Sequence, residues 1–151
     1  MLRCMSTPAS PHDLVRPLLR TRQVRAFTAK PPTDEQLEAI TDVARWSGSS
    51  TNEQPWRFIV IRDRTTIRAL ADLAMPSTRA LQSATAAIVV TIPADRERQV
   101  GRAYDEGRAA ERMLIAAGLL DLGAGIVWLW PKGLMPGYIF ASRGPPIMSL
   151  A

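Results

Sequence analysis

The spacing of apolar and polar residues predicts four helices. Leu14 and Leu18 lie four positions apart after Ser10, and serine is a residue type that caps helix starts. Thr33 and Gln36 have the spacing of a capping box, in which each side chain bonds to the other residue's backbone amide. The predicted helices cover Pro11–Thr21, residues 33 to about 46, Thr65–Ala74 and Val100–Leu122.

Three further stretches have the composition of strands. Trp56–Arg62 is dense in β-branched and aromatic residues, and Ala86–Ile92 is a continuous apolar run typical of a strand buried on both faces. Gly125–Trp130 is the third. The alternation of these strands with the helices predicts a sheet covered by helices on both faces, an α/β or α+β sandwich. Three strands make a thin sheet, which indicates that one more strand is missing from this count.

The length and composition fit a single folded domain with irregular ends. A chain of 151 residues that is 46% hydrophobic can bury a substantial core. We expect residues 1–10 to form a flexible N-terminus, 11–131 to form the domain, and 132–151, rich in glycine and proline, to form an irregular tail. The sequence leaves both Met1 and Met5 open as the start of the protein.

The net charge of +5 comes mainly from arginine, because Lys30 and Lys132 are the only lysines. Two interpretations stay open: a compositional habit, or attraction of anions such as the phosphates of a cofactor. The arginines are scattered and often adjoin acids, as in residues 62–64. Nucleic-acid binding usually needs clustered basic residues with aromatics between them, so we expect no nucleic-acid partner.

Histidine and cysteine chemistry is almost absent from the chain. His12 is the only histidine and Cys4 the only cysteine, so we expect neither a histidine-based metal site nor a Cys–His nucleophile. No apolar run reaches the roughly 18–20 residues of a membrane span. We therefore expect a cytoplasmic protein without a metal or a membrane partner, in which a cofactor would have to carry any redox or transfer chemistry.

Two polar segments offer groups that can bind such a cofactor. In Arg20–Phe27, three arginines at the end of a predicted helix can converge on a phosphate, whose oxygens match the guanidinium fork. A solvated basic face is the alternative interpretation. In Ser49–Trp56, adjacent hydroxyls and the amides of Asn52 and Gln54 can bond to a polar heteroaromatic edge. The alternative there is an ordinary polar turn.

Together the two segments resemble motifs of the FMN-dependent nitroreductase family. The family pattern Ala-Arg-x-x-x-Ser-x-x-Asn-x-Gln-Pro-Trp-x-Phe is matched from Ala44 to Phe58. The arginine motif near the start of family members is similar to Arg22–Phe27, with Gln23 where the family often has serine. The segment Tyr104–Met113 and the glycines that follow it also resemble the long central helix of the family and its exit.

The resemblance implies an α+β fold, a nitroreductase-like three-layer helix/sheet/helix sandwich that forms a homodimer with FMN at its interface. It implies that the arginine motif holds the FMN phosphate and ribityl chain, with Arg20 as a looser candidate. The polar loop would reach the flavin across the dimer, and backbone amides near Trp128–Trp130 would lie by its reactive face. The implied cofactor-binding residues are Arg22, Gln23, Arg25, Gly48, Ser49, Ser50, Asn52 and Gln54.

The resemblance also implies the activity, an FMN-dependent NAD(P)H oxidoreductase that transfers hydride through flavin N5 in a ping-pong cycle. Nitroaromatic or quinone-like small molecules would accept the electrons, NADH and NADPH both stay open as donors, and no catalytic side chain is required. After Trp130 the chain departs from the family pattern, so we expect the final helix and strand to be missing, by truncation, by a frameshift or in a natural short form. The alternatives are an inactive or storage-type flavin-binding remnant and a small anion- or nucleic-acid-binding module.

Overall fold

An antiparallel sheet forms the middle layer of the computed structural model, which describes residues 10–73, 76, 78–93, 97–129 and 137–138. Its strands lie side by side in the order β1, β2, β4, β3, and every neighbouring pair is antiparallel. The pairing of β1 with β2 extends over five residues of each strand, whereas β4 is short and lies between β2 and β3. The strands are β1 (Arg57–Ile61), β2 (Ala87–Thr91), β3 (Trp128–Leu129) and β4 (Gly137–Tyr138).

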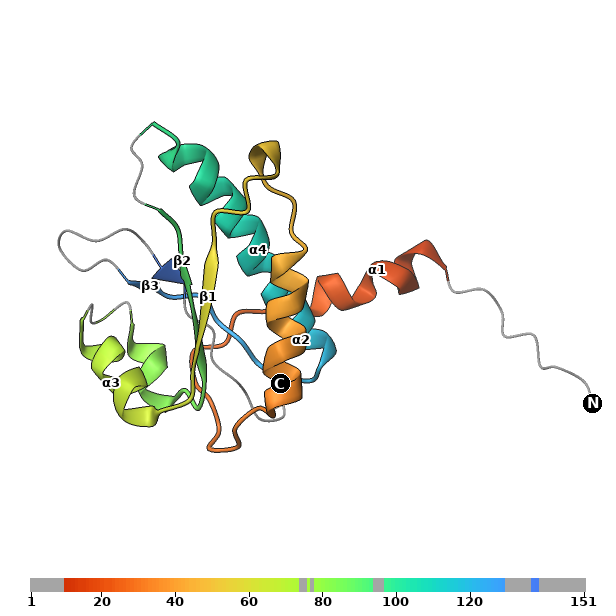
Figure 1. The fold of residues 1–151 in the computed structure, drawn as a ribbon. Coiled ribbons are helices and arrows are strands. Elements are labelled where there is room, and N and C mark those ends of the chain that lie inside the picture. The colour runs from red at the N-terminus through yellow and green to blue at the C-terminus, as the bar shows by residue number, and fades with distance from the viewer. Residues whose placement is uncertain (1–9, 74–75, 77, 94–96, 130–136, 139–151) are drawn as a thin grey trace, which may run out of the picture.

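Helices cover both faces of this sheet, as Figure 1 shows for α3 on one side of the strands and α2 with α4 on the other. The helices of the described residues are α1 (Pro11–Arg20), α2 (Asp34–Arg45), α3 (Arg64–Leu73) and α4 (Gln99–Leu119), and the short 3-10 helices are η1 (Ser50–Asn52) and η2 (Arg79–Ser83).

Alternating side chains of β2 divide the core into two apolar clusters, one on each face of the sheet. Ile88 and Val90 pack in the cluster with buried residues of α2 and α4. Ala87 and Val89 pack in the other cluster with α3 and η2. This arrangement is the three-layer α+β sandwich predicted from the sequence, and β2 has the two buried faces expected from its continuous apolar run.

The first helix stands apart from this sandwich. α1 projects from the body beside α4, and none of its residues is buried. Leu14, Leu18 and Leu19 are 70%, 51% and 63% exposed, although they form the apolar side of a strongly amphipathic helix. An amphipathic helix usually buries its apolar side, so the exposure of these side chains sets α1 apart from the other helices described.

Both predicted helix caps are confirmed. The Ser10 hydroxyl accepts from the Asp13 amide, and Thr33 and Gln36 form both bonds of the capping box. The first two predicted strands correspond to β1 and β2, each shorter than predicted by one residue at either end. Of the third, residues 128 and 129 form β3, and Ala124, just before the predicted strand, pairs with Gln23 in an isolated parallel bridge.

The prediction of an irregular segment over 132–151 is wrong at one place. Gly137–Tyr138 forms β4 and supplies the strand that was missing from the predicted sheet. A two-residue strand that contains a glycine and follows a proline has no apolar period, so the sequence pattern could not reveal it. The other residues of 132–151 lie outside the described residues, so the expected loss of the final helix and strand is not tested there. Most of the predicted flexible N-terminus also lies outside them.

The long helix α4 carries three charged residues on its buried side: Arg102, Asp105 and Glu106. The carboxyl group of Glu106 is fully buried, and neither oxygen has a hydrogen-bond partner among the described residues. This burial raises the pKa of Glu106 to about 8, because the charged form cannot be solvated there.

Across the described part of the chain, no helix is both long enough and apolar enough to span a bilayer.

The buried carboxyl of Glu106 predicts a pH-dependent stability. Because its pKa is raised on folding, its contribution is fully present below the unfolded value near 4.5 and is lost as the pH rises through about 8. The free energy of unfolding should fall by about 1.4 kcal/mol per pH unit across this window. Urea unfolding between pH 5 and 8 should show a much flatter dependence for Glu106→Gln. The exposed Glu111→Gln is the control, and an unchanged slope in Glu106→Gln would contradict the assignment.

Candidate functional site

The loop between α2 and β1 holds the predicted polar segment in an unusual backbone conformation. Thr51, Asn52 and Gln54 have φ angles of 52°, 55° and 48°, in the left-handed region. Such a conformation costs a β-branched residue like Thr51 on the order of 1–3 kcal/mol, and it persists only where surrounding contacts hold it. Strain of this kind clusters at binding and catalytic sites, which makes the loop a candidate site.

Hydrogen bonds within the loop bring its two amide side chains together. The Gln54 backbone amide donates to Ser49 Oγ at 2.8 Å, and Gln54 Nε2 donates to Asn52 Oδ1 at 3.2 Å. Both amide side chains belong to exposed residues. In this pairing Asn52 keeps its NH₂ group and Gln54 keeps its carbonyl oxygen for a ligand. The loop therefore presents a donor beside an acceptor.

One face of α4 holds the first part of this loop. Asp105 Oδ2 accepts a hydrogen bond of 2.8 Å from the Ser50 amide, and its side chain is only 4% exposed. Arg108, one turn further along α4, approaches the other Asp105 oxygen at 3.5 Å. The Arg108 guanidinium also covers Gly48, where an added Cβ would lie 2.8 Å from Nη2. The buried Asp105 carboxylate is thus both bonded and charge-compensated.

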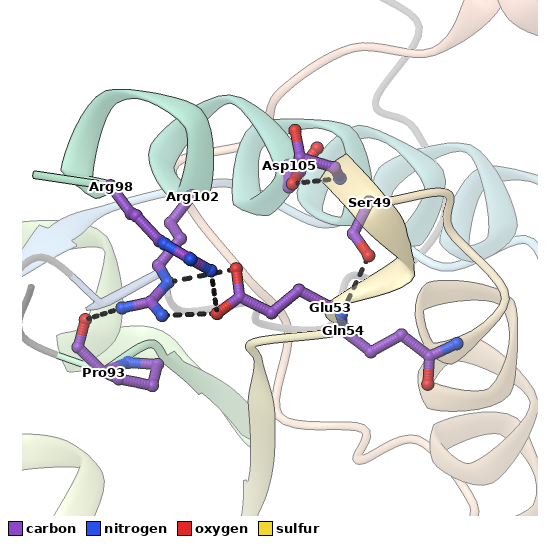
Figure 2. A network of polar contacts seen from close by, with 8 residues as sticks. Ser49, Glu53, Gln54, Pro93, Arg98, Arg102 and Asp105 are labelled. Atoms are coloured by element: carbon purple, nitrogen blue, oxygen red, sulfur yellow. Dashed lines mark hydrogen bonds and ion pairs between the residues drawn. The ribbon is translucent and has the colours of Figure 1, made fainter.

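The same face of α4 holds the second part of the loop through Glu53, as Figure 2 shows. Arg102 donates through Nη2 and Nε to the Glu53 carboxylate and through Nη1 to Pro93 O at 3.3 Å. Arg98 lies 3.6 Å from the same carboxylate and is more exposed than Arg102. The strained residues 51 and 52 therefore lie between two attachments to α4, one at Ser50 and one at Glu53.

The arginine segment lies elsewhere, directly after α1. Arg22 Nη1 donates to Leu19 O at 2.7 Å and to Thr21 O at 2.8 Å, so this side chain bonds the last carbonyls of the helix. These bonds use the two N–H groups of Nη1. Its Nε and Nη2 groups have no hydrogen-bond partner among the described residues and stay available to an anion.

Arg25 and Gln23 are tied to the chain that follows α4. Arg25 donates to Ile126 O and to Gln23 Oε1, both at 2.7 Å. The two segments approach so closely that an added Cβ at Gly125 would lie 2.3 Å from Val24 O. Since that contact is with backbone, only glycine fits there. Arg25 thus holds the segment in place, whereas Arg22 is the freer of the two guanidiniums.

A cavity of about 860 Å³ opens beside the arginine segment, between α1 and the C-terminal end of α4. Three guanidinium groups and one amide side chain contribute to its wall, which suits an anionic ligand with hydroxyl groups. One carboxylate from α1 and another after α4 also contribute. The polar lining residues are Asp13, Arg16, Arg20, Thr21, Arg22, Gln23 and Asp121.

The two predicted segments do not meet within one chain. The loop attaches to α4 at Asp105, whereas Thr21 lies against Gly118 near the other end of the same helix. At 1.5 Å per residue, these points are about 20 Å apart along the helix axis. Figure 1 shows the same separation, with η1 near one end of α4 and α1 near the other. The predicted residues therefore form two separate groups within the chain.

A second cavity, of about 610 Å³, lies between α2, the loop and β1. The sequence pattern does not reveal this cavity, because its wall combines residues whose proximity depends on the packing of α2 against the sheet. Gln54 belongs to this wall as well as to the strained loop. The lining residues are Thr41, Arg45, Trp46, Gln54, Trp56, Arg57, Phe58 and Val60.

The residues of α4 that hold the loop were not among the predicted site residues either. Arg102 and Asp105 are buried charges at an i, i+3 spacing, on a helix whose buried face is otherwise mostly apolar. That interruption of the apolar face was a readable signal, although their partners 49 and 55 residues away were not.

Of the predicted strand exit, Trp128 lies in β3 and Trp130 lies outside the described residues. Within the described ranges, no three His, Cys, Asp or Glu side chains gather as a metal site.

Comparison with known proteins identifies sequence relatives. Residues 18–92 match the model of the Nitroreductase family. A protein of Archaeoglobus fulgidus with the provisional name NADH dehydrogenase/NAD(P)H nitroreductase is 33% identical over 119 residues, which cover 78% of this chain and 67% of that protein. A protein of the same provisional name from Methanothermobacter thermautotrophicus is 29% identical over 117 residues, covering 77% of this chain and 60% of that one. The chain thus spans about three fifths to two thirds of the length of these relatives.

Solved structures share the fold. A provisionally named nitroreductase of Desulfovibrio desulfuricans, solved in complex with FMN, superposes with a TM-score of 0.71 at 28% sequence identity. The superposition covers 91% of this chain and 88% of that one. The three-layer sandwich and the sequence match therefore point to the same group of proteins.

Proposed function

Because this chain belongs to the nitroreductase family, we propose that it is an FMN-dependent oxidoreductase that uses NADH or NADPH as its electron donor. The observation that carries the proposal is the arginine-lined cavity of about 860 Å³ at the family's arginine motif. Bound FMN would supply the redox chemistry, a ping-pong transfer of hydride equivalents from the nicotinamide donor to a nitroaromatic or quinone-like acceptor. We place this reaction in the cytoplasm.

The residues of the arginine segment fit the phosphate end of FMN. Arg22 retains Nε and Nη2, which match two phosphate oxygens, and Arg20 extends into the same cavity. Gln23 lines the cavity and can offer its remaining polar atoms to the ribityl hydroxyls, whereas Arg25 holds Gln23 and the chain after α4 in place. In this proposal Arg22 contributes most of the phosphate affinity.

The loop residues fit the polar edge of the flavin ring. Asn52 and Gln54 present one donor and one acceptor side by side, which matches an edge that carries both carbonyl oxygens and an N–H group. Ser49 and Ser50 hold the backbone of the loop through their hydroxyl and amide groups, and Gly48 lets Arg108 cover it. No side-chain acid or base is assigned a catalytic role in this proposal.

In this proposal the two groups are half-sites of one FMN site, and a homodimer would bring them together although they lie about 20 Å apart along α4 in one chain. In a twofold-symmetric dimer, the loop of one copy can meet the arginine segment of the other, and the same contact occurs twice. The exposed apolar side chains of α1 and α4 support this arrangement, because a second copy would cover them. They include Leu14, Leu18, Leu19, Val100, Tyr104 and Leu119.

The proposed activity is tested directly with the purified full chain supplied with FMN. We expect NADH or NADPH to bleach the flavin absorbance under anaerobic conditions and a nitroaromatic or quinone to restore it. A chain that holds FMN but is not bleached by either nucleotide would instead be a flavin-binding remnant. A chain that takes up no FMN would contradict the proposal as a whole.

The role of Arg22 predicts a selective loss of FMN affinity. Arg22→Ala should raise the dissociation constant for FMN at least about tenfold, the equivalent of one charge-assisted hydrogen bond. Riboflavin has no phosphate, so the variant and the wild type should bind it alike in the same fluorescence titration. Arg68→Ala, on the exposed side of α3, serves as the matched control. Equal losses for FMN and riboflavin would count against phosphate recognition.

The shared site predicts complementation between two defective chains. Arg22→Ala and Asn52→Ala chains, each weak in FMN binding alone, should recover up to about a quarter of the wild-type sites when they are unfolded, mixed and refolded together. In a mixed dimer, one site receives both intact residues and the other receives neither. Recovery measured as bound flavin per chain checks this. A mixture that binds no better than the separate variants would show that each site lies within a single copy.

A further inference from the structure

The strained loop 49–54 has little structure of its own to maintain it. Its internal hydrogen bonds join near neighbours: Asn52 to Ser49, Glu53 to Ser50, and Gln54 to Ser49. Short-range bonds of this kind form in ordinary turns and do not require three left-handed residues. The contacts that reach outside the loop therefore decide which conformation it keeps.

Among these outside contacts, those of two buried residues of α4 attach the two ends of η1. Asp105 bonds the Ser50 amide at 2.8 Å, and Arg102 binds the Glu53 carboxylate through two of its nitrogens. Because Arg102 and Asp105 are one turn apart on the same buried face, their spacing is fixed by the helix. The distance between Ser50 and Glu53 is fixed with it.

Both residues of α4 are themselves held rigidly. Arg102 also donates to Pro93 O, and Asp105 also pairs with Arg108. The side chains of Arg102 and Asp105 are 10% and 4% exposed, so solvent does not compete strongly for their bonds. Figure 2 shows the two contacts at the two ends of the short η1 turn, with Gln54 beyond them.

We propose that Arg102 and Asp105 are positioning residues that hold the loop in its left-handed conformation and so present Asn52 and Gln54 to the flavin. The inference rests on the proposed function, since it assigns the loop to FMN. Neither residue touches the cofactor in this assignment. They act by removing, before FMN arrives, the conformational freedom that the loop would otherwise lose on binding.

Replacing Glu53, the loop residue of the ion pair with Arg102, tests the proposal more cleanly than replacing Arg102. Glu53 lies outside the core, so its loss disturbs the packing of α4 less. Glu53→Ala should leave the thermal midpoint of the FMN-free chain within a few degrees of the wild type, as measured by circular dichroism. Amide hydrogen exchange in a peptide covering residues 47–56 should become faster. The dissociation constant for FMN should rise about tenfold, the scale of one lost bond to a charged group.

Two further variants test Asp105 by conservative rescue. Asp105→Ala removes the acceptor for the Ser50 amide, whereas Asp105→Asn keeps an oxygen at that place. We expect FMN affinity to fall about tenfold in Asp105→Ala and to be largely retained in Asp105→Asn. If Asp105→Ala fails to fold, the measurements on Glu53→Ala still test the proposal. The matched control is Asp34→Asn, which breaks the ion pair of α2 with Arg62 far from the loop.

The outcomes separate this inference from the proposed function. A wild type that binds FMN, with Glu53→Ala showing faster exchange in the loop and weaker FMN binding, supports the positioning role. Faster exchange without a change in FMN affinity overturns it, as does an equal loss of affinity in Asp34→Asn. Unchanged exchange in Glu53→Ala also overturns it, because the contact then does not hold the loop. A wild type that binds no FMN contradicts the proposed function itself.

Discussion

The packing of α4 against the sheet is the constraint on which the rest of the structure depends. One side of the helix buries Ala109, Ala110 and Met113 in the larger apolar cluster, together with residues of α2 and β2. This burial fixes the rotation of α4 about its axis, since turning the helix would expose these side chains. Once the rotation is fixed, Arg102 and Asp105 can only face the chain between α2 and β1. The geometry of the loop is thus a consequence of core packing.

The sequence predicts those parts of the structure that depend on local chemistry. The caps at Ser10 and Thr33 and the strands β1 and β2 follow from side-chain types within a few residues, and all are confirmed. β4 was missed because two residues carry no periodic signal, and its place in the sheet depends on β2 and β3. Such an element is defined only by its neighbours.

The candidate site likewise has parts that the sequence predicts and parts that depend on packing. The identity of the polar loop and of the arginine segment was readable from residue types and their spacing. Their distribution over opposite ends of α4 was not, because it depends on how α1 and the loop pack against one helix. The contacts of Glu53 with Arg98 and Arg102 could not be predicted either, because the residues next to Glu53 in the sequence do not indicate a partner 49 residues away. The burial of Glu106 could not be predicted because a buried carboxyl is expected to have a partner, and this one has no hydrogen-bond partner among the described residues.

The separation in sequence between the loop and its anchors bears on the order of folding. Ser50 precedes Asp105 by 55 residues, and β1 and β2 both come before α4 in the chain. Contacts of such sequence separation close late, because a long segment must be ordered before they form. Before α4 packs against the sheet, the loop is therefore free to sample ordinary turn conformations. Docking of α4 is the step that selects the left-handed one, so the loop acquires its final shape only after most of the sheet exists.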